Sequence, residues 1–155
     1  MIIPGYVARN ARKYPDQEAV VEPGARHTWA ELDTRVNQLA NYLLNEHAIE
    51  PGHRVALFLP NNFAFIVSYF AVQRLGAVIV PVNVRLTTNE LTYILDDSGA
   101  ELVITCELTG TAVQPLHEQG TNVIWMDNID ELLNGLDSDE LELNIDIHGV
   151  KEKRS

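Results

Sequence analysis

Five short apolar runs recur along the chain, and the segments between the last four have helical spacing. The runs are rich in β-branched residues and show little polar alternation, as expected of strands buried on both faces. They are EAVVE (18–22), RVALFL (54–59), AVIVPV (77–82), ELVIT (101–105) and NVIWM (122–126). Strands that alternate with helices imply parallel pairing through crossovers. The pattern therefore predicts an α/β fold: a three-layer, mostly parallel sheet with helices on both faces.

Two of the predicted helices differ in their hydrophobic pattern. One carries a single apolar stripe (Leu32, Val36, Leu39, Ala40 and Leu43), with Glu31, Arg35, Asn41 and Glu46 off it. Such a helix packs one face on the sheet. The segment 61–76 is apolar nearly all round. We therefore expect its helix to lie between the sheet and a second surface, inside or outside this chain.

Helix ends are marked by two repeated signals. Thr28–Glu31 and Thr87–Glu90 both read T-x-x-E, the pattern of a capping box that opens a helix. Gly76, Gly99 and Gly120 stand where helices are expected to stop, as does Gly135. We predict one α/β domain over residues 1–135, followed by an acidic linker or disordered tail over 136–155, where the pattern is lost.

Charge and composition exclude several classes of partner. The formal net charge is −11, and no Lys or Arg occurs between Leu86 and Val150. This balance argues against nucleic acid as a partner. No apolar run approaches the roughly 20 residues of a transmembrane helix, and the N-terminus lacks the pattern of a secretory signal. The single cysteine, Cys106, lies in an apolar run, so we expect a buried thiol and a cytoplasmic protein.

No catalytic, cofactor-binding or metal-binding constellation is found in the residues. The closest glycines, Gly110 and Gly120, are ten residues apart, which excludes every glycine-rich phosphate loop. Only three lysines are present, the five histidines form no metal-ligand pair on one helical face, and no serine lies in a G-x-S-x-G elbow.

Asn83 and Arg85 follow the run AVIVPV and are the candidates for a substrate crevice. Open α/β sheets bind their ligands at the carboxyl ends of the strands. The alternative is structural: Asn83 makes a turn hydrogen bond, Arg85 pairs with a carboxylate and Thr87 caps a helix. We favour the structural alternative. For Trp29 and Trp125, anchoring of the core is likewise favoured over stacking on a ligand.

The order of several motifs resembles that of the adenylate-forming ligases, and of the acyl-CoA synthetases in particular. The resemblance covers roughly Ile3 to Asp130 without interruption and includes YPDQEAV (14–20) and PGHRVALFLPNN (51–62). Its most specific parts are the family's T-(Y/W)-x-E-L pattern at Thr28–Leu32 and its G-A-x-x-x-P-(V/L)-N pattern within Leu75–Asn83. From about Leu136 the sequence departs from the family's pattern.

The resemblance implies the N-terminal subdomain of an acid–CoA ligase for long- or medium-chain fatty acids. Family members join an acid to the α-phosphate of ATP and then to coenzyme A, so ATP, Mg and coenzyme A are implied for the full-length parent. The phosphate loop, the ribose-binding aspartate and the C-terminal lysine of the family lie downstream of the matched region. We therefore expect this chain to be inactive by itself, and expect its partner to be the remainder of the ligase.

Two other readings stay open. The chain could be a free-standing interaction or dimerisation module derived from that subdomain, which recruits a homodimer partner through the apolar helix at 61–76. A flavodoxin-like binder of a flavin or nucleotide is a third reading, disfavoured by the missing glycine-rich loops. The sequence does not decide whether the chain is an enzyme.

Overall fold

The computed structural model describes residues 5–141, 143–145 and 151–153. Its helices are α1 (Tyr6–Lys13), α2 (Trp29–His47), α3 (Phe63–Arg74), α4 (Thr88–Ser98), α5 (Gln114–Glu118), α6 (Ile129–Leu133) and the 3-10 turn η1 (Gly110–Ala112). Its strands are β1 (Glu18–Glu22), β2 (Ala25–Thr28), β3 (Arg54–Phe58), β4 (Val78–Pro81), β5 (Leu102–Thr105), β6 (Val123–Trp125), β7 (Leu143–Ile145) and β8 (Lys151–Lys153).

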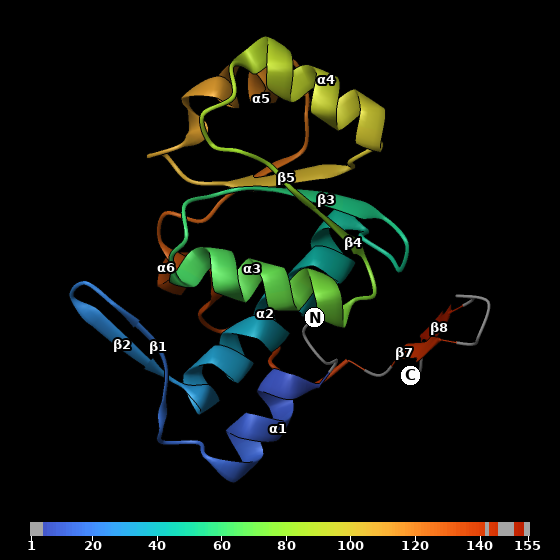
Figure 1. The fold of residues 1–155 in the computed structure, drawn as a ribbon. Coiled ribbons are helices and arrows are strands. Elements are labelled where there is room, and N and C mark those ends of the chain that lie inside the picture. The colour runs from blue at the N-terminus through green and yellow to red at the C-terminus, as the bar shows by residue number, and fades with distance from the viewer. Residues whose placement is uncertain (1–4, 142, 146–150, 154–155) are drawn as a thin grey trace.

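The predicted parallel sheet is confirmed, with four strands in the order β4-β3-β5-β6. Four of the five apolar runs supply these strands. The fifth, EAVVE, forms β1, which pairs with β2 in a separate antiparallel hairpin away from the sheet (Figure 1). The sequence did not reveal this pairing because β2 (ARHT) has no apolar alternation of its own.

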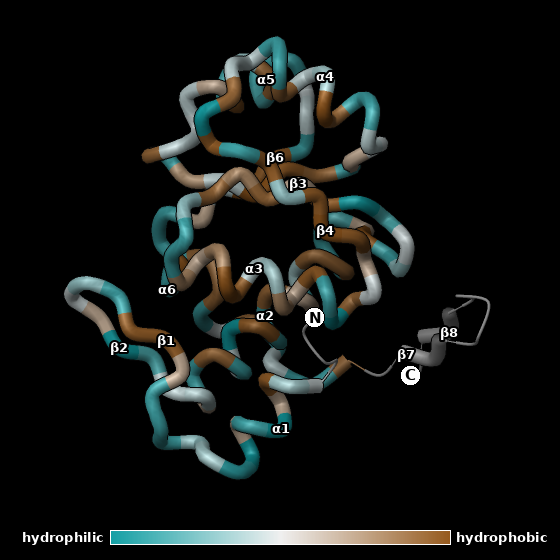
Figure 2. The backbone as a smooth tube through the Cα atoms, in the orientation of Figure 1, coloured by the Kyte–Doolittle hydropathy of each residue, from teal (hydrophilic) through white to brown (hydrophobic). Residues whose placement is uncertain are grey.

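Side chains from the central strands alternate between two cores. On β3, Val55 and Leu57 join α2 and α3 in the larger core, while Ala56 and Phe58 join α4 and α5 in the smaller one. Figure 1 shows α4 and α5 on one side of the sheet and α2, α3 and α6 on the other. The apolar residues of Figure 2 concentrate along the strands and the facing helices. The three-layer prediction is therefore confirmed, with α1 packed outside on α2.

The second surface expected against the apolar helix lies within this chain: it is α2, which packs against α3. Six residues of α3 are buried, namely Phe63, Ala64, Val67, Ser68, Ala71 and Val72. Four others, Phe65, Ile66, Tyr69 and Phe70, are only partly buried and lie on the outer side of α3.

The two T-x-x-E signals differ in outcome. At α4 the capping box is complete, since the Glu90 N–H donates to the Thr87 hydroxyl and the Thr87 N–H donates to the Glu90 carboxylate. At α2 the Thr28 hydroxyl accepts from the Glu31 N–H, but the Glu31 carboxylate turns instead towards His27. Gly99 ends α4 in the left-handed conformation (φ 71°), as predicted.

Beyond α6 the chain stays close to α2 for several residues. Leu136 and Leu141 are partly buried and pack against the larger core, and β7 and β8 then pair as a short antiparallel ribbon. The domain boundary after residue 135 stays a prediction, and part of the predicted tail lies outside the described residues. Within the described part of the chain, no helix is long and apolar enough to cross a membrane.

Candidate functional site

The carboxyl ends of β3 and β4 border a small apolar groove of about 410 Å³. It is lined by Leu59, Pro60, Asn61, Phe65, Pro81, Val82, Asn83 and Val84. Asn83 is therefore at the groove expected for a strand-end crevice, whereas Arg85 does not line it. The two candidate residues are neighbours in sequence, but only one of them reaches the groove.

Local hydrogen bonds account for much of the loop that carries Asn83. Its side-chain oxygen accepts from the Arg85 N–H at 2.9 Å, and its carbonyl accepts from the Leu86 N–H at 3.1 Å, which closes a tight turn before the Thr87 cap. Arg85 is exposed, and among the described residues no carboxylate lies within ion-pair distance of it. A role of Asn83 and Arg85 in a substrate crevice stays a prediction.

A larger and more polar pocket of about 830 Å³ lies at the carboxyl ends of β3 and β6, on the α2 and α3 side of the sheet. The β1–β2 hairpin and α2 form one wall, and α6 with the loop before it forms another. Its ionisable lining residues are Glu22, Arg26, His27, Glu31, Arg35, Asp127 and Asp130. Four carboxylates thus face two guanidinium groups and one imidazole.

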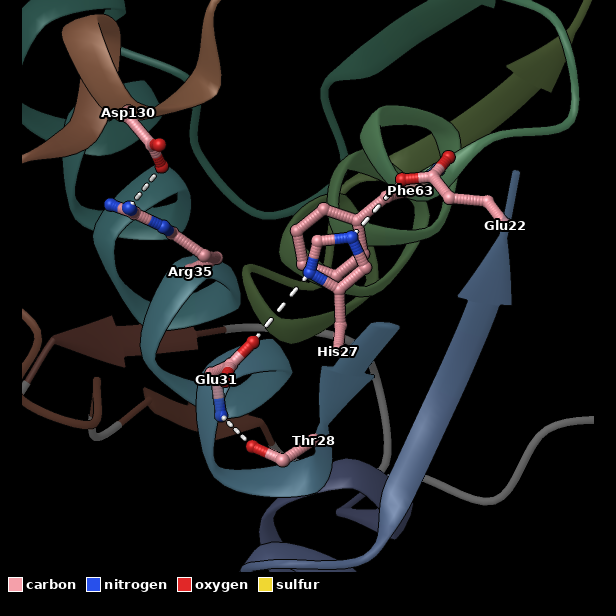
Figure 3. Close-up of polar contacts among 7 residues, drawn as sticks. All are labelled: Glu22, His27, Thr28, Glu31, Arg35, Phe63 and Asp130. Carbon is pink, nitrogen blue, oxygen red and sulfur yellow. Dashed lines mark hydrogen bonds and ion pairs between the residues drawn. The ribbon is translucent and has the colours of Figure 1, made fainter. Parts of the chain in front are cut away.

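His27 is the centre of one side of this polar pocket (Figure 3). Its ring lies parallel to that of Phe63, with the centroids 3.6 Å apart and an interplanar angle of 5°. Its Nε2 is 3.0 Å from a Glu22 carboxylate oxygen, and its Nδ1 is 3.6 Å from a Glu31 oxygen. The imidazole is therefore enclosed by an aromatic face and two carboxylates.

Glu22 and Arg35 form the hydrogen bonds and the ion pair that link the walls of the pocket. The second Glu22 oxygen accepts from the Phe63 N–H at 3.2 Å, at the first turn of α3, so the hairpin is fastened to that helix. Arg35 on α2 donates to Asp130 of α6 and, at 2.9 Å, to Gln38. Five of the seven ionisable groups of this pocket thus pair with each other, an arrangement that holds elements together.

The site residues offer no catalytic constellation in the part of the chain that the structure describes. There, no group of three or more His, Cys, Asp or Glu side chains is placed to hold a metal ion. Cys106 is buried, as expected, with its Sγ 3.4 Å from the Thr109 hydroxyl. Trp29 packs partly buried against the core and meets Tyr6 edge-on, and Trp125 meets His117 edge-on. Both tryptophans have intramolecular partners, consistent with core anchoring.

The polar pocket was not predicted from the sequence. One signal was available: Glu31, Arg35 and Gln38 recur at four and three residues, which places them on one polar face of α2. Their partners Glu22 and Asp130 are distant in sequence, and Arg35 and Asp130 are 95 residues apart. No spacing rule could have joined these groups before the fold was known.

Known proteins resemble this chain in sequence and in fold. The profile of the family described as "AMP-binding enzyme" matches residues 7–154. The match continues past Leu136, where the sequence pattern predicted a departure from the family. The long-chain-fatty-acid–CoA ligase FadD13 of Mycobacterium tuberculosis is 34% identical over 134 residues, which is 81% of this chain and 26% of that protein. A feruloyl-CoA synthase of an Amycolatopsis species is 45% identical over 96 residues, 62% of this chain and 19% of its own length.

Solved structures agree with the sequence relatives. The crystal structure of the N-terminal domain of FACL13 from Mycobacterium tuberculosis superposes with a TM-score of 0.79 at 32% identity, covering 90% of this chain and 38% of that one. The fold thus matches the N-terminal domains of adenylate-forming ligases. The chain spans about a quarter or less of the length of the two ligases above.

Proposed function

This chain belongs to the AMP-binding enzyme family, and we propose that it forms the N-terminal subdomain of an ATP-dependent acid–CoA ligase. The observation that carries the proposal is the match of family, sequence and fold over nearly the whole chain, together with its small share of the ligases' length. The complete protein would activate a carboxylic acid with ATP and transfer the acyl group to coenzyme A. A long- or medium-chain fatty acid is the proposed substrate, and the names of two relatives, both long-chain-fatty-acid–CoA ligases, support the long-chain part of this proposal.

The chain by itself is proposed to be inactive, with the missing part of the ligase as its partner. Nothing in the described residues offers a phosphate-binding loop, and the apolar groove at Asn83 and the polar pocket at His27 both open at the carboxyl ends of the strands. Open α/β sheets bind ligands at this edge. A cytoplasmic location is part of the same proposal.

A domain exchange tests the proposal. Residues 7–154 of this chain replace the matching part of the M. tuberculosis ligase FadD13, and formation of acyl-CoA from a fatty acid is measured. We expect a folded chimera with measurable acid- and CoA-dependent turnover, and the same ligase with its matching part deleted is the inactive control. A chimera with native-like cooperative unfolding but no turnover contradicts the proposal.

A second candidate function is suggested by the partly buried outer side of α3. Phe65, Ile66, Tyr69 and Phe70 lie there together, and exposed apolar surface favours association. In this alternative the chain is a free-standing module that dimerises through α3. Sedimentation that stays monomeric over a hundredfold range of concentration rules it out, whereas dimers that Tyr69→Lys dissolves would support it.

A further inference from the structure

Helix α2 has a second face that does not pack on the sheet. Its side chains form hydrogen bonds to the backbone of another segment. Gln38 and Asn41, three residues apart, are amides whose side chains are only 7% and 5% exposed. The hydrophobic pattern placed Asn41 off the apolar stripe, where solvent was the expected neighbour. What buries them is the segment after α6, residues 136–141, which we call the strap.

The contacts with the strap are made to backbone carbonyls. Asn41 Nδ2 donates to the carbonyls of Asp137 at 3.1 Å and Asp139 at 3.0 Å, as well as to Asn37 in its own helix at 3.0 Å. Gln38 Nε2 donates at 3.4 Å to the Leu136 carbonyl. Because the acceptors are main-chain groups, these amides fix the path of the strap whatever its side chains are.

The strap is anchored at both ends. On its N-terminal side, Arg35 pairs with Asp130 of α6 and also donates to Gln38, which in turn donates to the Leu136 carbonyl. The order of contacts along α2 follows the order along the strap. Leu136 and Leu141 pack against the larger core at either end of the bonded stretch. Partly buried hydrogen bonds and apolar packing therefore act on the same six residues.

We propose that Gln38 and Asn41 are positioning residues that fix the direction in which the chain leaves this subdomain. The significance of this role rests on the proposed function: in a complete ligase, everything beyond the strap starts from the place that these two amides set. The local claim about the strap can be tested without ligase activity, so failure of one proposal is distinguishable from failure of the other.

The test uses the 155-residue chain and a protease that cleaves after acidic residues. The strap carries Asp137, Asp139 and Glu140, all exposed, but cleavage needs the backbone to open into an extended form. Asn41→Asp keeps the shape of the side chain, removes the donor and sets a carboxylate against two carbonyls. Losing the two partly buried hydrogen bonds to the strap is expected to raise cleavage within the strap about tenfold.

Asn45→Asp is the matched control, because Asn45 is exposed one turn further along α2 and the charge change is the same. Gln38→Glu is a second variant: it still accepts from Arg35 but cannot donate to Leu136, and we expect a rise of about threefold. A positioning role predicts faster cleavage confined to the strap, with the melting temperature of each variant close to that of the Asn45→Asp control. Cleavage of Asn41→Asp no faster than the control, or raised equally after Glu101 and other acids outside the strap, overturns the proposal.

Discussion

Single residues of this chain show how closely its helices and strands approach each other. Gly110 is needed for space: an added Cβ would lie 2.4 Å from Cζ3 and 2.8 Å from Cη2 of Trp125. The backbone φ of Gly110 is not in the left-handed region, so the constraint comes from the indole and not from conformation. The packing of Trp125 on β6 therefore depends on the absence of a side chain at residue 110.

Replacing Gly110 by Ala is expected to lower the free energy of unfolding by about 1–3 kcal/mol, because the indole must move away from its place. Chemical denaturation of the variant measures this loss. In a Trp125→Leu background the same substitution is expected to cost much less, since the clashing ring atoms are gone. Equal costs in the two backgrounds would show that the indole is not the cause.

Ser68 is a polar residue in an apolar setting. Its side chain is fully buried on α3, and its hydroxyl oxygen is the one buried side-chain nitrogen or oxygen, among those the structure describes, with no hydrogen-bond partner. A buried unpaired hydroxyl lowers stability, and alanine is the better helix former.

Ser68→Ala is therefore expected to raise the free energy of unfolding by about 1 kcal/mol. Ser98→Ala is the matched control: this serine ends α4 and donates to the Leu95 carbonyl at 3.3 Å, so its removal should not stabilise. Thermal unfolding of both variants decides the matter. A destabilised Ser68→Ala would mean that the hydroxyl has a partner in solution.

Among the helices and strands, the N-terminal cap of α4 makes the stability of the fold depend on the protonation of Glu90. Hydrogen bonds from the Thr87 backbone N–H and from its hydroxyl hold the pKa of Glu90 below its usual value. A carboxyl whose pKa is lower in the folded state stabilises that state above its unfolded pKa. This contribution is lost as the pH falls through the lowered pKa.

Glu90→Gln is therefore expected to flatten the acid limb of stability against pH. The wild-type chain should lose more of its stability than Glu90→Gln as the pH falls from 7 through the ordinary glutamate pKa of about 4.3 and below. Denaturant midpoints over this range measure the difference, with Glu46→Gln, an exposed position on α2, as control. Parallel pH profiles for wild type and Glu90→Gln would argue against the lowered pKa.

The positions of the helices and strands were largely predictable from the sequence, but the contacts of their side chains were not. The strands β3 to β6 and the helices between them follow from local hydrophobic periodicity, and Thr28, Thr87 and Gly99 mark helix ends as predicted. The Glu31 carboxylate turns towards His27, which lies only four residues earlier, in strand β2 directly before the helix. Local signals specify local structure, but at α2 a second local partner, His27, takes the Glu31 carboxylate and leaves the capping box incomplete.

The candidate site was less accessible to sequence reasoning. Asn83 could be placed at a strand end from its position after AVIVPV. The polar pocket and the strap, in contrast, join residues up to 98 apart in the sequence. The hydrophobic pattern placed Asn41 off the apolar stripe of its helix, and nothing in that segment indicates the strap that buries Asn41 and Gln38.

At the scale of the whole molecule, the chain has two cores, one on each face of a four-stranded parallel sheet, and grooves at one edge of it. Its family relation and its length relative to the ligases make it a structural part of a larger enzyme in the proposed account. In that account the stability of the chain and the position of the strap matter more than any reactive group in the chain.

The measurement that tests the central claim most directly is carboxylic-acid-dependent exchange between ATP and pyrophosphate, which reports adenylation alone. It is made on the 155-residue chain and on the protein whose reading frame continues beyond Ser155, both checked for cooperative unfolding. We expect no exchange above background for the chain by itself and fatty-acid-dependent exchange for the longer protein. Acid-dependent exchange by the isolated chain, or its absence from the folded longer protein, would contradict the account.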